Sequence, residues 1–584
     1  LSFGYTKAQN TAKESDFDRF NIRFNTDIEI LPVLKTRFDL SISRTNSNVF
    51  DTAIPADLSR GTVTSPTFLA LIKSPIVSPY TYNAIIKDYS EILSDYDDIY
   101  QQLNNVQRGL GTAQSLANPA AILEYGKGNN KNRAENTVFN ILLAPTWEIN
   151  SHLKISENLS YSLVRNSQRY YRPYTGVPPY TISELGTVYA KVASFQAKQN
   201  HIFSDTRLEW GNIYGSHTIR AFGGFRYNRF SYDATMLAED KDSKTDDKNP
   251  ALEGTNTNST SSGAADIWKQ MQWYANADYN YQNRYFATVS ILGEANSRFG
   301  ENAGSKIFGV GWAFFPSIQA GWVITNEQWF PKTKGVNYLR LNVGFDTSGN
   351  DNISNYAAQT SYTPVRYNYR AIGAQLTNIG NDQIKWELTK KFNAGLQGHF
   401  VNNRISLGFN YYIHNTSDLL TLKTFDNPIG GINRYWTNGG SLRNEGFEVT
   451  FSGKPVVTKN WQLELGATIG HYKNKITALP DGDYTTTLYG AEILTSVGNP
   501  AGLFYGYQTD GVFSTSAEAA AYGKSHLNSD GQTTTNLYME NSAGQKIDFQ
   551  AGDIHFIDQN GDGIISEADK TIIGDPNPDI FGNI

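Results

Sequence analysis

The residues whose types and spacing best suit ligand chemistry lie in 558–569, near the end of the sequence. Oxygen-bearing side chains occupy the first, third, fifth and twelfth positions of this segment, and Gly563 occupies the sixth. Calcium loops of twelve residues use this spacing, with a backbone carbonyl at position seven and a water-mediated contact at position nine. The spacing therefore predicts a structural calcium site with the ligands Asp558, Asn560, Asp562, Ile564, Ser566 and Asp569.

The same residues also permit a simpler structure. Asp and Asn side chains accept hydrogen bonds from nearby backbone N–H groups, and such turns need no metal. Asp569 stands where calcium loops usually carry Glu, so the closing carboxylate reaches less far and weaker binding is expected. A calcium sensor pairs two loops between amphipathic helices, and the sequence shows neither a second loop nor such helices.

Motifs for catalysis are missing from the sequence. The chain has no Cys, which excludes disulfides, thiolate metal sites and thiol nucleophiles. Its eight His are scattered, and no H-E-x-x-H, G-x-S-x-G or phosphate-loop motif occurs. A net charge of −6 argues against a nucleic-acid partner, which normally requires a basic face. We therefore predict that the protein is not an enzyme, although a carboxylate pair at glycosidase spacing cannot be recognised from sequence.

The elements that must position these residues are predicted to be strands. In 20–30, Phe20, Phe24 and Ile28 fall on one face, while the residues between them are mostly polar. The segments 34–43, 405–414 and 461–470 alternate in the same way. Successive side chains of a strand point to opposite faces, so each segment has one apolar and one polar side.

The connections between these strands alternate in length. The short ones are 31–33, 149–152, 282–284, 400–404 and 454–460; the long ones are 46–135, 166–200, 231–265, 347–385, 416–444 and 474–576. Short turns at one end and long loops at the other are typical of outer-membrane barrels. The pattern predicts an all-β protein, a large antiparallel transmembrane β-barrel with roughly fifteen to sixteen strands and long extracellular loops. A soluble β-sandwich is the alternative, because its strands alternate as well.

The domain organisation follows from this pattern. Residues 1–584 are predicted to be one barrel fragment, with 474–576 as a long extracellular insertion that contains the loop 558–569. Both ends of the sequence read as strands, so we expect the chain to be an excerpt of a longer protein. No apolar run approaches the ~20 residues that a membrane-spanning helix requires.

Several specific motifs follow one another between 284 and 579. They are Ser297-Arg298-Phe299, Phe315-Pro316-Ser317, Gly321-Trp322, Asn326-Glu327, Lys385-Trp386-Glu387, "NNRI" at 402–405, "NEGFE" at 444–448, "GNPAGLFYGYQTDGVF" at 498–513 and "AGDIHFIDQNGDGIISEADKTIIGDPNPD" at 551–579. In residues and order they resemble the SusC/RagA family of TonB-dependent outer-membrane transporters, and "DFDRFNIRFN" at 16–25 extends the likeness toward the start.

The resemblance implies a barrel of about 22 strands with an N-terminal plug, embedded in outer-membrane lipid. It also implies coupling to TonB through the plug and a SusD-like surface lipoprotein that closes over the barrel as a lid. Judged by this resemblance, we expect plug, TonB box and last strands to lie outside this chain. The loops at 169–180 and 363–373, rich in Tyr and Arg, are candidates for contact with cargo or lid; ordinary packing and an interfacial aromatic girdle are the alternatives.

The function that follows is import of nutrients, most often oligosaccharides, across the cell outer membrane. Alternatives within the transporter class are a RagA-like peptide importer and a siderophore receptor. Outside the class, a calcium-stabilised surface adhesin would dissolve without detergent, and a secreted glycan hydrolase would release reducing ends from polysaccharide.

Overall fold

The computed structural model describes residues 1–584 except 12, 14, 49–64, 73–77, 93–117, 126–132, 173–179, 183–185, 242–256, 332, 334, 368–370, 430, 489, 523–537 and 541–544. The chain forms two compact units. Unit 1 contains Leu1–Gly211, Phe222–Tyr274 and Glu294–Ser297, and unit 2 contains Asn212–Ala221, Ala275–Gly293 and Arg298–Ile584.

Unit 1 contains a ladder in which each strand pairs antiparallel with the next one along the chain. The strands are β1 (Ser2–Gln9), β2 (Asp16–Leu31), β3 (Leu34–Asn48), β6 (Arg133–Asn150), β7 (Leu153–Arg172) and β10 (Ala190–Tyr214). The structure has the alternation predicted for 20–30: Phe20, Phe24 and Ile28 lie on one face of β2, and all three are exposed.

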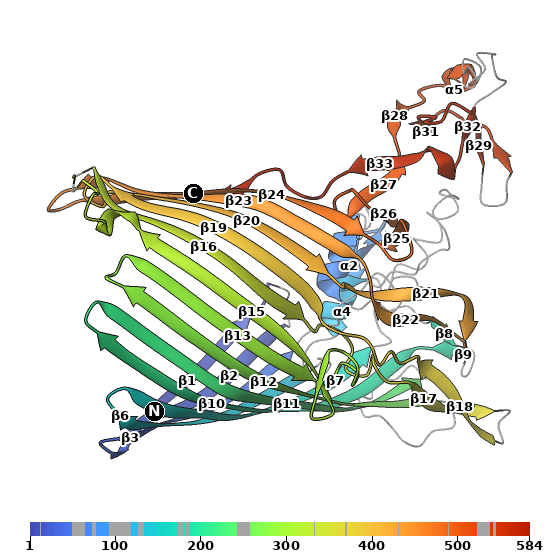
Figure 1. Cartoon of the computed structure of the whole chain (residues 1–584). Helices are drawn as coiled ribbons and strands as arrows, with labels where there is room; N and C mark the ends of the chain where they lie inside the picture. The colour runs from blue at the N-terminus through green and yellow to red at the C-terminus, as the bar shows by residue number, and fades with distance from the viewer. Residues whose placement is uncertain are drawn as a thin grey trace. The chain divides into compact units, whose positions relative to one another are not determined.

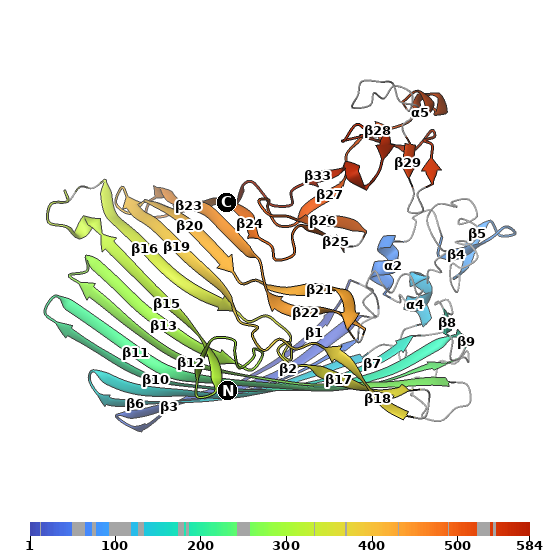
Figure 2. The same ribbon diagram turned by 45° about the vertical axis from the view of Figure 1, so that its right-hand side comes forward.

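Unit 2 contains a second antiparallel ladder, whose members run side by side in Figure 1 and Figure 2. The strands are β15 (Val310–Val323), β16 (Val336–Asn350), β19 (Glu387–Phe400), β20 (Ile405–Ser417), β23 (Ser441–Val457), β24 (Gln462–Ala478) and β34 (Phe581–Asn583).

Strand faces in unit 2 differ in polarity, as the alternation predicts. On β16, Leu341, Val343 and Phe345 are 36%, 39% and 43% exposed. The residues between them are polar or Gly and face the opposite side, which carries Arg340 and Asn342. An exposed apolar face is stable only against lipid or another apolar surface, so the ladder has the two-faced character of a membrane barrel wall.

Strand β10 ends within unit 2, and three further strands have residues in both units: β11 (His217–Lys241), β12 (Thr257–Tyr281) and β13 (Tyr285–Asn296). Together with the two ladders and the short strand β14 (Ser305–Ile307) they bring the described total to seventeen, of which fifteen have eight or more residues. The fifteen longer strands agree with the predicted fifteen to sixteen; the two additional strands, β14 and β34, have three residues each.

Strand lengths exceed the prediction. Strands β10, β11 and β12 have 25 residues each, so they extend into the segments 166–200 and 231–265 that were predicted as loops. The reason is that ladder hydrogen bonds stabilise polar sequence as well as alternating sequence once the strand leaves the hydrocarbon. The turn at Gly215, where φ is +59°, was not predicted.

The remaining elements are short. In the loops between ladder strands they are α2 (Pro66–Ile72), β4 (Tyr80–Asn83), β5 (Asp88–Ile92), α4 (Pro119–Tyr125), β8 (Tyr180–Ile182), β9 (Gly186–Val188), η2 (Ile324–Asn326), β17 (Ser361–Tyr367), β18 (Ala371–Asn378), β21 (Leu420–Ile429) and β22 (Ile432–Asn438). Within the described residues, none of the helices is both long and apolar enough to cross a membrane.

The segment between β24 and β34 forms several small sheets. It runs from 479 to 580, a few residues later at both ends than the predicted insertion 474–576. Its elements are β25 (Tyr484–Leu488), β26 (Ala491–Thr495), β27 (Leu503–Tyr507), β28 (Thr509–Val512), α5 (Ser516–Tyr522), β29 (Tyr538–Glu540), β30 (Lys546–Ile547), β31 (Ile554–Phe556), β32 (Ile564–Ile565), η3 (Glu567–Asp569) and β33 (Lys570–Gly574).

Candidate functional site

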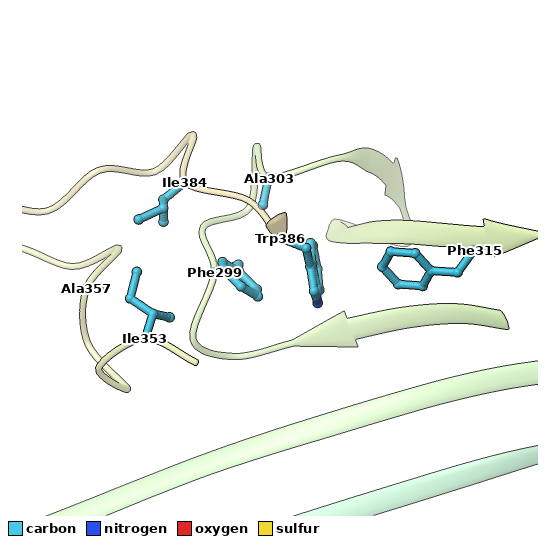
Figure 3. Close-up of a cluster of buried hydrophobic side chains, with 7 residues drawn as sticks. All are labelled: Phe299, Ala303, Phe315, Ile353, Ala357, Ile384 and Trp386. Atoms are coloured by element: carbon cyan, nitrogen blue, oxygen red, sulfur yellow. The ribbon is translucent and has the colours of Figure 1, made fainter. Parts of the chain in front are cut away.

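Several of the motif residues meet in one buried cluster of unit 2, although the sequence separates them widely. We call it the motif cluster, and its members come from the loops after β13 and β16, from β15 and from the loop before β19. It consists of Phe299, Ala303, Phe315, Ile353, Ala357, Ile384 and Trp386. Figure 3 shows Trp386 between Phe299 and Phe315. These loops lie at the ends of the strands opposite the short turns.

Close approaches hold the motif cluster together. The ring centroids of Phe299 and Trp386 are 4.2 Å apart, at an interplanar angle of 41°. Gly300 passes the backbone of Asp382 so closely that a Cβ at residue 300 would overlap it. Such packing leaves little room for substitution.

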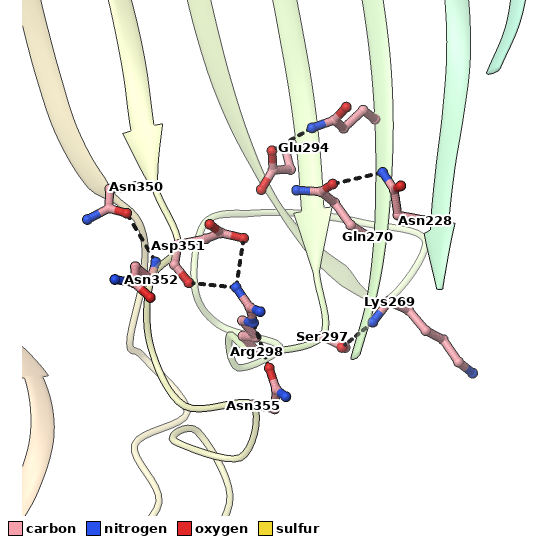
Figure 4. Close-up of polar contacts among 11 residues, drawn as sticks. Asn228, Lys269, Gln270, Glu294, Ser297, Arg298, Asn350, Asp351, Asn352 and Asn355 are labelled. Atoms are coloured by element: carbon pink, nitrogen blue, oxygen red, sulfur yellow. Dashed lines mark hydrogen bonds and ion pairs between the residues drawn. The ribbon is translucent and has the colours of Figure 1, made fainter. Parts of the chain in front are cut away.

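Polar contacts join the same loops. Arg298 donates from Nε to Asn355 Oδ1 at 2.7 Å and from Nη1 to the carbonyl oxygen of Asp351 at 3.2 Å (Figure 4). Glu387, from the Lys385-Trp386-Glu387 motif, accepts the backbone N–H of Leu420 at 2.9 Å through Oε1. The motif residues therefore connect the loops at the long-loop end of the unit 2 ladder to one another.

A second group of contacting side chains lies around Glu327, at the short-turn end of unit 2. Its side chain is 8% exposed and accepts three hydrogen bonds. The donors are the hydroxyl of Tyr285 at 2.6 Å, Trp322 Nε1 at 2.9 Å and Arg284 Nη1 at 3.2 Å. Glu327 thus links the turn after β12 to the turn after β15. These hydrogen bonds, that of Tyr285 first, hold the pKa of Glu327 below its ordinary value of 4.5.

Replacing Glu327 by Gln is expected to lower the melting temperature at pH 7 by about 2–5 °C. The Gln amide has one acceptor oxygen instead of two, so the three donors lose one of the acceptor atoms they share, and the negative charge that pairs with Arg284 is lost as well. A depressed carboxylate pKa stabilises the folded state above the unfolded pKa, and this stabilisation is lost as the pH falls through the folded value.

The difference between Glu327→Gln and parent should therefore shrink as the pH falls below about 4.5 and toward the lower pKa of the folded state, at which the parent carboxyl itself takes up a proton. Thermal unfolding in detergent at pH 7 and pH 3 measures this. Glu301→Gln is the control, because its side chain is 63% exposed. A gap that persists unchanged at pH 3 would contradict the assignment.

The loop 558–569 has the turn structure that its sequence predicts. Asp558 accepts the N–H groups of Gly561 and Gly563 at 2.7 and 2.8 Å, and Asp562 Oδ1 accepts that of Ile564 at 2.8 Å. Gly563 has φ of +82°, as the sharp turn requires. Asp569 is fully buried and accepts N–H groups from Gln559, Asn560 and Ser566.

The donor set of this loop suits calcium in chemistry, because it consists of oxygen atoms only. The carboxylates are nevertheless occupied by backbone N–H groups, and the described part of the chain contains no group of three or more His, Asp or Glu side chains placed to hold a metal. Hydrogen bonds between the carboxylates and the backbone of the loop thus hold its conformation. Calcium binding by Asp558, Asn560, Asp562, Ile564, Ser566 and Asp569 stays a prediction.

Lys570 ties this loop to the sheet beside it. Its ammonium contacts Glu492 on β26 and Glu567 on η3, each at 2.6 Å. Burial disfavours the charged form, but the hydrogen bonds to both carboxylates outweigh it and raise the pKa of Lys570. The lysine is therefore charged at any physiological pH and fastens the loop to the sheet.

The two loops predicted to contact cargo or lid lie only partly within the described residues. Residues 173–179 of the first and 368–370 of the second are outside them. Their role stays a prediction.

Residues 79–552 match the family model "TonB dependent receptor-like, beta-barrel". The chain belongs to this family, and its fold is that of the large antiparallel transmembrane β-barrel of these receptors. The prediction of a SusC/RagA-type barrel is confirmed.

Named relatives agree with this assignment. TonB-dependent receptor P3 of Formosa agariphila is 26% identical over 405 residues, covering 66% of this chain and 37% of the relative. TonB-dependent receptor SusC of Bacteroides thetaiotaomicron is 28% identical over 320 residues, covering 53% of this chain and 29% of the relative. The chain thus spans well under half the length of these relatives.

Among solved structures, the RagAB peptide importer in its open-open state superposes with a TM-score of 0.70 at 20% identity. The match covers 94% of this chain and 55% of the other. At this identity the likeness concerns the fold alone.

Proposed function

We propose that the chain is the barrel part of a nutrient importer of the cell outer membrane, which takes up oligosaccharides together with a SusD-like surface lipoprotein and is driven by TonB. The observation that carries the proposal is the gathering of the family motifs into the motif cluster at the long-loop end of a ladder with one apolar exposed face. In this position the cluster would support the loops that meet lid and cargo. Transport needs no catalytic group, in agreement with the absence of enzyme motifs from the sequence.

Deleting the gene of the full-length protein is expected to abolish growth on one class of glycan, because molecules of that size do not cross the outer membrane without a carrier. Growth on the monosaccharides of the same glycan should be unchanged, which serves as the control. Co-purification of a lipoprotein with the tagged barrel would support the lid. Normal growth on every glycan and peptide offered would contradict import.

Peptide import is the second candidate, and the structural likeness to the RagAB peptide importer favours it. The same deletion strain distinguishes the two: a defect confined to peptide media would replace glycan by peptide as the cargo.

Calcium at the loop 558–569 is proposed as a structural addition to this function. The spacing of its oxygens and the turn at Gly563 support the proposal. Isothermal titration of the full-length protein with CaCl₂ should give a binding heat that is lost in Asp558→Ala and Asp562→Ala. Asp548→Ala is the control, since its side chain is 72% exposed and lies outside the loop. Equal heats in all variants and parent would exclude a calcium ion at this loop.

A further inference from the structure

The exposed apolar face of β2 continues across the neighbouring strands of the unit 1 ladder. Register pairs Ile22 of this face with Ile42, Ile42 with Phe139 and Phe139 with Leu163, and we call these four residues the apolar row. An antiparallel barrel wall turns such a face toward lipid. The apolar row therefore marks the lipid-facing side of β2, β3, β6 and β7.

Positively charged side chains follow on the same side, toward the long-loop end. Directly paired residues share a face of the sheet, and so do residues two or four positions apart on one strand. Five cations lie on the lipid-facing side by this rule, and we call them the basic belt. It consists of Arg44, Arg165 and Lys198 in a first row, two residues beyond the apolar row, and of Arg133 and Arg169 in a second row, four residues farther on.

The other side of the sheet carries no charge at this level. Beyond the apolar row, twelve positions face lipid, three on each of β3, β6, β7 and β10, and they include the five cations and one carboxylate, that of Glu135. The twelve positions that alternate with them face the lumen, and all are uncharged: Ser43, Thr45, Ser47, Ala134, Asn136, Val138, Val164, Asn166, Gln168, Phe195, Ala197 and Gln199. The positive charge thus lies on the side that faces the membrane.

Like charges are placed opposite each other within the basic belt. Arg165 is paired directly with Lys198, and Arg133 with Arg169. The Cβ atoms of directly paired residues are only about 5 Å apart, and like charges in such positions destabilise a sheet. An anion bound between the members of a pair removes this repulsion.

The chain supplies little negative charge of its own to the basic belt. Glu135 is shared by Arg44 and Arg133, whose Nη2 atoms lie 2.9 Å and 2.6 Å from its two carboxylate oxygens. Asp16 and Asp18 lie at the border, on β2. The three other cations of the basic belt are exposed, and none of them has a hydrogen-bond or ion-pair partner among the described residues. They are therefore open to an anion from outside the chain.

A hollow of about 850 Å³ lies beside two of these three cations. Arg165 and Lys198 are its positively charged lining residues and Asp233 is its negatively charged one, so the hollow has a net positive charge. Ser167 adds a hydroxyl that can donate a hydrogen bond. A guanidinium, an ammonium and a hydroxyl together suit the oxygens of a phosphate group.

The position of the basic belt decides which phosphate can reach it. Two residues of a strand span about 7 Å, so the first row lies directly beside the apolar row, where lipid headgroups adjoin the hydrocarbon. Tyr161 lies on the same side, two residues from Leu163, and its hydroxyl donates to Asn200 Oδ1 at 2.9 Å. A Tyr in such a place is typical of a membrane interface. A phosphate attached to a lipid is favoured over one in solution, because the lipid chains also contact the apolar row.

We propose that the basic belt binds the phosphate group of a membrane lipid in the leaflet at the long-loop end. The phosphate lies between Arg165 and Lys198, where Ser167 donates a further hydrogen bond, and the acyl chains follow the apolar row. The inference rests on the membrane location of the proposed importer and adds a lipid partner that is independent of the cargo.

Quenching of a fluorophore at residue 196 by a nitroxide-bearing lipid tests the proposal. Gln196 is exposed and lines the hollow, and residues 1–584 contain no Cys. Full-length protein with Gln196→Cys, and with any Cys outside this chain replaced by Ser, is labelled with bimane in dodecyl maltoside. The probe is phosphatidylglycerol with a nitroxide on an acyl chain close to the headgroup, and the same lipid with a choline headgroup is the neutral comparison. We expect phosphatidylglycerol to quench at a lower concentration than the choline lipid.

Removing charge from the basic belt should abolish this preference. Adding Arg165→Gln and Lys198→Gln should raise the phosphatidylglycerol concentration for half quenching about thirtyfold, the effect of removing two cations from beside an anionic headgroup. High NaCl should weaken the preference of the parent, because salt screens exposed charges. Arg19→Gln with Arg23→Gln is the matched control, since both arginines lie on the lumen-facing side of β2 and the same charge is removed. Its half-quenching concentration should equal that of the parent.

Excess sodium phosphate distinguishes a lipid from a free ion, and we expect it to displace little phosphatidylglycerol. Five results would overturn the site: equal quenching by both lipids, no change after the two substitutions in the basic belt, an equal rise in the control variant, displacement by sodium phosphate, or no bimane labelling at residue 196. A preference for phosphatidylglycerol in a protein whose deletion impairs no growth would keep the lipid site and reject import. A growth defect without this preference would do the reverse.

Discussion

Replacing Trp386 by Ala is expected to reduce the free energy of unfolding by about 3–5 kcal/mol, the usual result of truncating a large aromatic in a close-packed core. Trp386 is 4% exposed and its ring packs, tilted, against that of Phe299, so the substitution leaves a cavity that the loops around it cannot fill. Urea unfolding in detergent micelles measures the change. Because the motif cluster supports the long-loop end, the variant should also lose import.

Phe314→Ala is the matched control for this substitution. Phe314 is also aromatic, but its side chain is 44% exposed. Phe314→Ala should therefore reduce the free energy of unfolding much less than Trp386→Ala does. Equal losses for the two variants would show that the motif cluster contributes no more to stability than a residue on the exposed face.

The second large effect is expected from Gly300→Ala, which should destabilise the protein by about 3 kcal/mol, at the upper end of overpacking effects. A Cβ at residue 300 would overlap the backbone of Asp382 rather than a side chain. The clash cannot be relieved by a rotamer change, so the loop after β13 must move away from the loop before β19. Urea unfolding is again the measurement, and protease cleavage within 297–304 should become faster.

Gly395→Ala tests whether the effect comes from the clash. A Cβ there would meet Asn410 Oδ1 at 3.4 Å and the carbonyl oxygen of Phe409 at 3.6 Å, which is ordinary contact. The free energy of unfolding of this variant should remain within about 1 kcal/mol of the parent's. Ala is a better residue than Gly in a strand, which offsets the small cost of the contact. If Gly300→Ala is equally mild, the approach of the two loops is looser than the structure indicates.

The sequence alone predicted the features that depend on neighbouring residues. Period-two alternation predicted the strands and the exposed apolar face of β2, because side-chain direction follows from strand geometry itself. The oxygen spacing of 558–569 predicted its turns, since Asp558 and Gly563 interact within one loop. The motifs indicated the family, which the comparisons confirmed.

Features that depend on distant residues came only from the tertiary structure. Arg298 belonged to a motif, but nothing local marked Asp351 and Asn355 as its partners. Likewise, Glu327 was part of a motif, whereas its contact with Tyr285 joins two separate turns. Loop packing of this kind depends on which strands are neighbours.

A row of glycine and asparagine residues across the unit 2 ladder is the clearest case. Gly321, Asn342, Gly395 and Asn410 lie on four strands and have no recognisable spacing in the sequence. They form one row because the register between strands aligns them, and register is decided by long-range pairing rather than by local periodicity. Sequence periodicity therefore determined which residues form the wall, and strand register determined which of them lie side by side.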